Sequence, residues 1–299
     1  MSFITPGFFS LGNNWNLLFN LMPLVIVSIG QTCVMLTGGI DLSITSTIAL
    51  SSVVGASFMS SDSGLGFNPS VSTFIGIGVM LVVGAAIGLV NGVAVTKLGM
   101  PAFMVTLTTM MFFSGFAVWL TESQNIYNLP DSFLRISSMS MRDVPIPVVA
   151  ALGVMLIAYF ILNTTVIGEW IYAVGLNVKV ARISGVNVDG TIISCYVFCG
   201  VCAALGAVLY TSRLETGSPI MGQNILLDVI GAVVIGGTSL FGGKGKVKWT
   251  LFGVLFISLL DNGLNLIGLS YFLIMIVKGL VILFAAILNV LKERPSLAS

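Results

Sequence analysis

The stretch VSTFIGIGVMLVVGAAIGLVNGVAV, residues 71–95, runs from end to end without a charged side chain. A helix rises about 1.5 Å per residue, so about 20 apolar residues are enough to cross the hydrocarbon core of a bilayer. Gly84, Gly88 and Gly92 recur at every fourth position within it, which places them on one helix face and lets a neighbouring backbone approach closely. The stretch therefore predicts a membrane-spanning helix that packs tightly through its glycine face.

The rest of the chain has the same character. Of its 299 residues, 57% are hydrophobic and 8% are charged, whereas soluble domains carry about 25% charged residues. So few charged residues cannot provide a water-facing surface, which excludes a soluble globular protein. Residues 1–299 are therefore predicted to form a single transmembrane domain. The long stretches without a charge are 1–40, 42–61, 63–96, 98–121, 144–168 and 190–212.

The pattern predicts an all-α fold, a polytopic integral membrane helical bundle of about nine to ten transmembrane helices with one or more broken or re-entrant segments. Beyond residue 212 the apolar runs are shorter and contain Asp228, Asp261 and Lys278, which is typical of helices with buried polar points. The predicted spans are 16–36, 43–59, 71–95, 101–120, 146–162, 191–210, 225–240, 249–267 and 271–291.

Lysine and arginine predict the orientation, because positive residues in short loops stay on the cytoplasmic side. An odd number of spans places the first residue outside, whereas a re-entrant break at residues 38–41 would return it to the cytoplasm. The predicted cytoplasmic end contains Lys97, Lys179, Arg182, Lys244, Lys246, Lys248, Lys292 and Arg294. The opposite loops contain Asp62, Glu122, Asp131, Arg135, Arg142, Asp143, Arg213 and Glu215.

Composition excludes several kinds of site. A net charge of +1 without a long basic block argues against nucleic acid as a partner. The sequence has no histidine, so imidazole metal sites and histidine proton relays are excluded. Cys199 and Cys202 form a CxxC in the middle of a span, and Cys195 shares their helix face. Because no second pair completes a metal site, we expect these thiols to behave as small hydrophobic side chains.

Residues 236–246, GGTSLFGGKGK, are only superficially similar to a phosphate-binding loop. A nucleotide P-loop needs a glycine five residues before its Gly-Lys pair and Ser or Thr after the lysine, but Thr238 and Gly245 occupy these positions. We therefore expect the chain to bind no cofactor and not to be an enzyme. Any energy from ATP must then arrive through a partner.

Charged and amide side chains within the spans are the candidates for a solute pathway, because polar groups at membrane depth are costly unless they are used. Asp41 either caps the helix that follows it or lies on the pathway. Asp228, Asp261 and Lys278 either neutralise one another inside the bundle or contact solute. The neutral candidates, which suit an uncharged polyhydroxyl solute or hydrogen bonds between helices, are Gln31, Asn91, Asn224, Asn262 and Asn265.

The longest cytoplasmic loop, at about residues 168–190, is not a simple polar turn. Apolar Val178, Ala181 and Ile183 alternate with Lys179 and Arg182, which predicts a short amphipathic helix that ends near residues 184–185. The helix either lies on the lipid surface or docks into another protein, in which case it would transmit motion.

Three blocks of the sequence resemble the inner-membrane permease subunits of bacterial ABC importers for monosaccharides, the ribose/xylose/arabinose-type family. They are residues 36–43 (LTGGIDLS), 173–185 (AVGLNVKVARISG) and 228–245 (DVIGAVVIGGTSLFGGKG). A looser likeness lies at residues 261–266 (DNGLNL). The similarity covers nearly the whole chain, with the blocks in the same order.

The resemblance implies a small-sugar permease of the bacterial inner (cytoplasmic) membrane that alternates between outward and inward openings. It implies three partners: cytoplasmic ABC ATPase subunits that hold ATP and Mg²⁺, a periplasmic sugar-binding protein, and a second permease copy, identical or paralogous. The second block is similar to the coupling helix of that family, which seats in a groove of the ATPase. The residues that match it here are Gly175, Asn177, Lys179, Ala181, Arg182, Ser184 and Gly185.

Relatives of this type usually have about ten helices and a cytoplasmic amino terminus, so nine predicted spans imply that the first helix is missing or dispensable here. Three rival functions stay open: an ion-coupled transporter that uses Asp228, Asp261 or Lys278, an ABC permease for branched amino acids or nucleosides, and a membrane scaffold without transport activity. A charged amino acid would need compensating charges in the pathway, so the sparse ionic residues favour an uncharged sugar.

Overall fold

The computed structural model describes residues 10–63, 68–141 and 144–293. Within these ranges, seven helices are long and apolar enough to cross a membrane, which agrees with the predicted polytopic bundle. They are α1 (Leu11–Leu36), α3 (Pro69–Lys97), α4 (Ala102–Leu120), α6 (Ile146–Thr164), α9 (Val188–Leu214), α11 (Val247–Leu266) and α12 (Tyr271–Glu293). Arg142, Asp143 and Arg294, which entered the predicted orientation, lie outside the described residues.

Two of the predicted spans form helices that are too short to cross a bilayer alone. Helix α2 (Ile44–Met59) has 16 residues and α10 (Leu226–Ile235) has 10, which correspond to about 24 Å and 15 Å of length. The predicted span 225–240 was wrong at its end, because Gly236 terminates the helix and Gly237 adopts a φ of +80°. Irregular backbone precedes both helices, so the bundle contains broken segments, as the sequence predicts.

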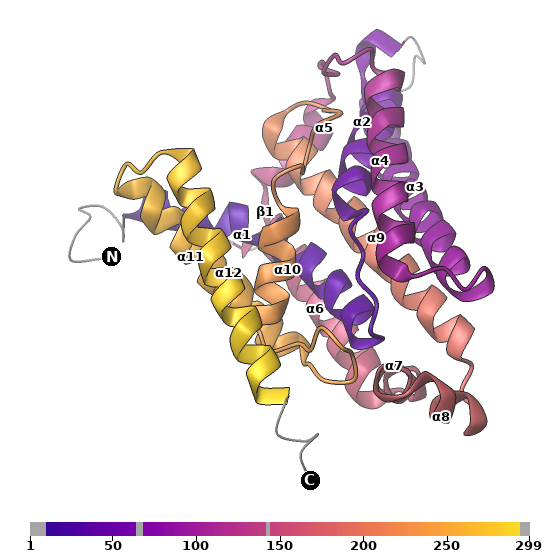
Figure 1. Cartoon of the computed structure of the whole chain (residues 1–299). Coiled ribbons are helices and arrows are strands. Elements are labelled where there is room, and N and C mark those ends of the chain that lie inside the picture. The colour runs from indigo at the N-terminus through magenta and orange to yellow at the C-terminus, as the bar shows by residue number, and fades with distance from the viewer. Residues whose placement is uncertain (1–9, 64–67, 142–143, 294–299) are drawn as a thin grey trace.

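The remaining elements are short and lie at the two ends of the bundle (Figure 1). One end carries η1 (Ser61–Ser63), α5 (Asp131–Leu134), η2 (Arg135–Ser137) and a small antiparallel ribbon of β1 (Ser140–Met141) and β2 (Val144–Pro145). The other end carries α7 (Val166–Leu176), which begins two residues before the predicted loop 168–190, and α8 (Val178–Ile183), which lies within it. The amphipathic helix predicted there is therefore present, and α7 precedes it.

Helices α1 and α9 form the centre of the bundle. In their most apolar windows 78% of α1 and 61% of α9 is buried, whereas only 6% of α12 and 17% of α4 is buried. Close contact between the central helices requires Gly30, because a Cβ there would lie 2.8 Å from Cys202 Cβ and 2.9 Å from Cys199 Cα. The CxxC therefore belongs to a helix contact, and its thiols are buried and free.

The glycine face of residues 71–95 packs on α9, as the sequence predicts. A Cβ at Gly88 would overlap the carbonyl oxygen of Tyr196, and a Cβ at Gly84 would overlap that of Gly200. Helix α3 begins at Pro69, where the side chain of Asn68 accepts a hydrogen bond from Ser70 N at 3.2 Å. Its contact with α9 is one of backbone against backbone.

The charged residues separate between the two ends of the bundle. Lys97 and Arg182 both reach Asp189, at 2.8 Å and 2.9 Å. At the opposite end, Asn128 Nδ2 donates to Asp62 Oδ2 at 2.9 Å. The break after α1 does not change which end of the bundle is which. After the break, the chain continues through α2 to the end of the bundle where Asp62 lies. Helix α1 and the segment after it therefore cross the bundle in opposite directions (Figure 1).

Candidate functional site

A polar pocket of about 380 Å³ opens between α1, α9, α10 and α11. It lies toward the end of the bundle opposite α7 and α8, where Asn13 of α1 pairs with Asn262 of α11. We name it the triad pocket, after the triad of Asp228, Asp261 and Lys278. Its lining residues are Leu17, Asn20, Leu24, Tyr210, Ile225, Asp228, Ile257, Ser258, Asp261, Asn262 and Asn265.

The triad joins three helices through one ammonium group. Lys278 Nζ on α12 lies 2.9 Å from both carboxylate oxygens of Asp228 on α10 and 3.0 Å from Asp261 Oδ1 on α11. The side chains of Lys278 and Asp228 are 15% and 18% exposed, whereas that of Asp261 is 42% exposed. The positive charge of Lys278 is therefore shared by the two carboxylates.

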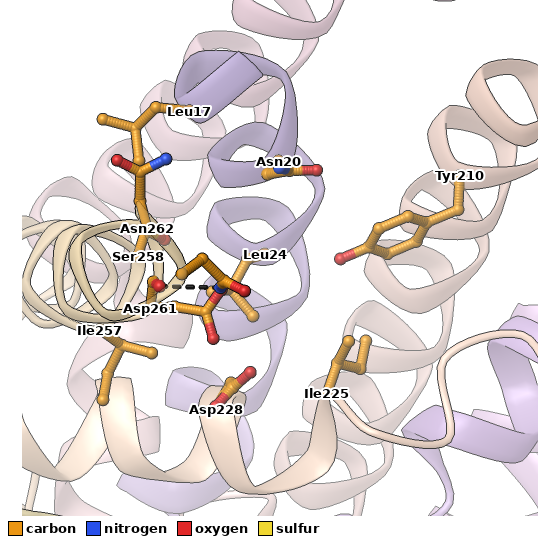
Figure 2. A pocket seen from close by; sticks show the side chains of 11 residues that line it. Leu17, Asn20, Leu24, Tyr210, Ile225, Asp228, Ile257, Ser258, Asp261 and Asn262 are labelled. Carbon is orange, nitrogen blue, oxygen red and sulfur yellow. Dashed lines mark hydrogen bonds between the residues drawn. The ribbon is translucent and has the colours of Figure 1, made fainter. Parts of the chain in front are cut away.

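Polar groups without a protein partner point into the triad pocket. Figure 2 shows the hydroxyl of Tyr210 directed toward the space that Asp228 and Asp261 face. Within the described residues, neither this hydroxyl nor the side-chain amide of Asn20 forms a hydrogen bond with the protein. Asp261 Oδ2 accepts a hydrogen bond from Asn265 Nδ2 at 3.1 Å, and carboxylate lone pairs remain. The pocket is therefore rich in acceptors for a solute that donates hydrogen bonds.

The predicted pathway residues separate into two groups. Asp228, Asn262 and Asn265 line the triad pocket. Asn224 instead lines an adjoining cavity of about 100 Å³ between α10 and α12, which Asp228 and Lys278 also line. The structure thus gathers the candidates from the carboxyl-terminal third of the sequence around the triad pocket and its adjoining cavity. Gln31, Asp41 and Asn91 do not line this space.

Gln31, Asp41 and Asn91 are fully buried at the break between α1 and α2. Asp41 Oδ1 accepts hydrogen bonds from Ser43 N at 2.8 Å and Ser43 Oγ at 2.6 Å. Asn91 Nδ2 on α3 donates to Ser43 Oγ at 2.7 Å, and Asn91 Oδ1 accepts from Thr109 on α4 at 2.8 Å. A chain of hydrogen bonds thus connects the break to two spans.

The amide of Gln31 completes this network from α1. In the orientation that satisfies both of its polar atoms, Nε2 donates to Asp41 O and Oε1 accepts from Asp41 N, each at 3.2 Å. The backbone between Gly38 and Ser43 is irregular, so side chains must satisfy the polar groups that no helix pairs. This geometry fits the alternative that Asp41 caps the turn before α2 and that the amides bond between helices.

The coupling segment, which we define as residues 166–185, forms α7 and α8. Asn177 Oδ1 accepts from Lys179 N and Val180 N, at 3.0 Å and 3.1 Å, which starts α8 as a helix N-cap does. Ala181 is buried at 3% exposure, whereas Val180 is 58% and Ile183 is 87% exposed. Helix α8 therefore presents apolar side chains outward.

The end of α8 is fixed by its own sequence and by one ion pair. Ser184 N donates to Val180 O at 3.0 Å, and Gly185 has a φ of +82°, which favours glycine and stops the helix. Arg182 pairs with Asp189 on α9, whereas Lys179 has no ion-pair partner within the described residues. Arg182 thus holds α8 against the bundle, and Lys179 stays available to a partner.

Gly175 of the coupling segment packs directly on backbone from two distant parts of the chain. A Cβ at this position would overlap Leu36 O at the end of α1 and Gly243 N in the loop before α11. Gly243 N in turn donates to Leu36 O at 2.8 Å, and Tyr172 Oη donates to Gly245 O at 2.9 Å. We call this contact the glycine junction. It brings together the three sequence blocks that begin at residues 36, 173 and 228.

Sequence reasoning missed several residues of these sites. Asn20 and Tyr210 line the triad pocket from α1 and α9, and Asp189 anchors Lys97 and Arg182. Polar residues inside apolar runs are a signal that could have selected Asn20 and Tyr210. No local signal marks Leu36, because it contributes only a carbonyl oxygen to the glycine junction.

Comparison with known proteins identifies the family. Residues 14–286 match the family model described as branched-chain amino acid transport system / permease component. The ribose import permease protein of Escherichia coli K12 is 37% identical over 297 residues, which cover 98% of this chain and 90% of that protein. The ribose import permease protein of Bacillus subtilis strain 168 is 38% identical over 291 residues, 97% of this chain and 88% of that protein.

A third relative has a different named sugar. The D-allose transport system permease protein of E. coli K12 is 33% identical over 286 residues, which cover 95% of this chain and 86% of that protein. No solved structure matches the chain. The family match covers most of the chain and includes both the triad pocket and the coupling segment. This multi-pass helical membrane protein therefore belongs to the family of permease components that the model describes and that includes the ribose import permeases.

Proposed function

We propose that this chain is the membrane permease subunit of an ATP-driven bacterial importer for a small, uncharged sugar. The observation that carries the proposal is the identity of 37% to a ribose import permease over 98% of the chain. Relatives named for allose and fructose point to the same class of solute. The triad pocket, lined by carboxylate, amide and hydroxyl groups, suits a solute with many hydroxyl groups.

In this proposal the triad pocket is an outer station of the solute pathway. The Lys97–Asp189–Arg182 cluster and the lysines of residues 244–248 lie at the end of α7 and α8, and the positive-inside rule assigns that end to the cytoplasm. The pocket, at the other end, then faces the periplasm. A periplasmic sugar-binding protein would deliver the solute there.

The coupling segment is the proposed contact with the cytoplasmic ATPase. Its support is the exposed apolar surface of Val180 and Ile183 beside the unpaired Lys179. The seven assigned residues divide into those that build the segment and those that touch the partner. Asn177, Ala181, Arg182, Ser184 and Gly185 shape α8, and Gly175 anchors the segment to the bundle. Lys179 is the charged contact.

The remaining parts of the transport system are proposals that follow from this role. ATP and Mg²⁺ are held by the ATPase subunits, and this chain binds no cofactor of its own. A second permease copy, identical or paralogous, would share the pathway, and the site of action would be the bacterial inner membrane. The apolar surface of α12, of which 6% is buried in its most apolar window, would face lipid or that second copy.

A branched amino acid is the second candidate solute, because the description of the matching family model names a branched-chain amino acid transport system. An amino acid carries a carboxylate, which needs a cationic donor when it leaves water. In the described ranges, the lining of the triad pocket contains no lysine or arginine, and the nearby Lys278 is paired with two aspartates. This arrangement favours the sugar.

Uptake into proteoliposomes tests the proposal. The permease, its ATPase and its binding protein would be reconstituted together and supplied with radiolabelled ribose, allose, fructose or leucine. We expect ATP-dependent accumulation of at least one sugar and no accumulation by the permease alone. Accumulation of leucine without any of the sugars would contradict the solute assignment, and uptake driven by an ion gradient without the ATPase would contradict the mechanism.

A further inference from the structure

The charge of the triad pocket restricts the charge of the solute, in addition to any restriction on its size and hydroxyl groups. Among the residues that the structure describes, the side chains that line the pocket include two carboxylates and no cation. Within the described part of the chain, the ammonium in contact with them is that of Lys278, whose Nζ lies 2.9–3.0 Å from oxygens of Asp228 and Asp261. With two negative charges and one positive charge, the triad carries a net charge of −1.

Among the described residues, Arg213 is another cation near this end of α9, and its Nη1 is buried without a hydrogen-bond partner, away from the pocket lining. Its guanidinium lies over the ring of Phe19, with Cζ 5.8 Å from the ring centroid, and Arg213 is not among the lining residues. Asp228 lies in the first turn of α10, so its carboxylate meets the positive end of that helix. The helix terminus is therefore already occupied by an anion of the protein.

The donors and acceptors that remain free in the pocket are unequal. Asp261 is 42% exposed and holds lone pairs beyond those used by Lys278 and Asn265. The unpaired hydroxyl of Tyr210 and amide of Asn20 are neutral and can each donate or accept. A solute hydroxyl can donate to Asp261, whereas a solute carboxylate or phosphate would face Asp261 without a cationic side chain in the described lining to meet it.

We propose that the triad pocket is a charge filter, which admits neutral and cationic polyols and rejects polyols that carry a carboxylate or a phosphate. Asp261 is the residue that carries this selectivity. It is held in place by Lys278 and Asn265, and its half-exposed carboxylate offers its remaining lone pairs to the solute. The inference rests on the proposed function, since it takes the pocket to be part of the solute pathway.

The test compares three five-carbon ligands of nearly equal size and different charge: ribitol, ribonate and 1-amino-1-deoxyribitol. The permease–ATPase complex in nanodiscs, without binding protein, is equilibrated by dialysis with radiolabelled ribose and each competitor. We expect ribitol and the amine to displace ribose at similar concentrations and ribonate to require a concentration about tenfold higher or more. Equal competition by ribonate and ribitol would overturn the charge filter.

Two variants assign the selectivity to the pocket. Asp261→Asn leaves Lys278 paired with Asp228. It should reduce the gap, which is the ratio of the ribonate and ribitol concentrations that displace ribose, by about tenfold. Asn20→Lys adds an ammonium at an exposed lining position and should also favour ribonate. Asp62→Asn is the matched control, since it removes the same charge from an exposed site at the same end of the bundle but not from the pocket. A gap that changes as much in Asp62→Asn as in Asp261→Asn would refute the local origin.

The outcome is distinguishable from failure of the proposed function. If the proteoliposomes accumulate sugar but ribonate competes as well as ribitol, the charge filter is wrong and the function stands. If dialysis gives the expected ranking while the proteoliposomes accumulate no sugar, the proposed transport function is wrong and the charge preference of the pocket stands. Binding of ribose that none of the three competitors displaces would overturn the assignment of the pocket as a polyol site.

Discussion

Lys278 is the residue on which the geometry of the triad pocket depends. It is the single side chain of α12 that reaches both α10 and α11 through ion pairs in the described residues. Removal of a buried ion's partner costs more than removal of the whole pair, because the remaining charge is left without compensation. Asp228, at 18% side-chain exposure, would be the group most affected.

Replacement of Lys278 by methionine should destabilise the protein. The substitution keeps an unbranched side chain that is only one heavy atom shorter but leaves two carboxylates together in a partly buried site, with an expected loss of about 3 kcal/mol of unfolding free energy. The measurement is thermal unfolding of the purified permease in detergent, followed by fluorescence. The double variant Lys278→Met with Asp228→Asn should recover part of the loss, because it removes one of the two uncompensated charges.

Lys97→Met is the matched control for this prediction. Lys97 also pairs with an aspartate, Asp189, but its side chain is 60% exposed, so the loss should be less than about 1 kcal/mol. An equal decrease in unfolding temperature for the two lysine variants would show that the triad is no more important than a surface ion pair.

At the scale of elements, the glycine junction connects the coupling segment to the bundle. Helix α7 rests on the last carbonyl of α1 and on the loop that follows α10, through Gly175 and Gly243. Directly after that carbonyl comes the break, whose Asp41–Ser43–Asn91 network reaches α3. A displacement of α7 and α8 would therefore act at once on α1, α2 and the α10–α11 loop. Such shifts of packed elements are a common form of conformational coupling.

Gly175→Ala should uncouple the permease from its ATPase. The added methyl group overlaps backbone atoms of Leu36 and Gly243, which cannot rotate aside as a side chain could. We expect the stimulation of ATPase activity by sugar-loaded binding protein to fall by roughly 2- to 30-fold, which corresponds to about 0.5–2 kcal/mol of coupling. The assay is ATP hydrolysis by the reconstituted complex, with co-purification of the ATPase measured in parallel.

Gly153→Ala in α6 is the control, because a Cβ there has no neighbouring atom within 4 Å. It should leave both stimulation and assembly unchanged. If Gly175→Ala retains full stimulation, the glycine junction is a packing contact without a role in coupling.

At the scale of the whole molecule, the two ends of the bundle differ in charge, and this difference predicts the orientation in the membrane. Lys97, Arg182 and the loop of residues 244–248 share the end of α7 and α8, whereas Asp62 and Asn128 lie at the other. Positive residues are retained in the cytoplasm, so the first end should face inward. The native cysteines are all buried, so introduced thiols can report on the two ends separately.

Cysteine labelling tests this orientation. Gln124→Cys and Lys248→Cys place one thiol at an exposed position of each end. A membrane-impermeant maleimide added to spheroplasts should label only the variant at residue 124, and the pattern should reverse in inside-out vesicles. The parent protein should remain unlabelled in both. Labelling of residue 248 from outside would contradict the orientation and, with it, the placement of the triad pocket toward the periplasm.

Much of the architecture could be predicted from the sequence. Each of the nine predicted spans contains a helix, and the glycine face of residues 71–95 meets α9 as expected. These features depend on local hydropathy, on residue spacing and on helix-ending glycines. The span 225–240 was predicted too long, because the prediction continued across Gly236 and Gly237, where the helix ends. The helix and the apolar run both end at Ile235.

The sequence by itself determined that this chain is a membrane bundle, where its helices lie and which end carries the positive residues, because hydrophobicity and charge act through the residues of each segment. Only the tertiary structure decided which carboxylates share Lys278, that Gln31, Asp41 and Asn91 bond at the break instead of lining the triad pocket, and that Gly175 rests on Leu36 and Gly243. Each of these contacts joins residues far apart in the chain. Their geometry follows from how the helices pack, which no single segment encodes.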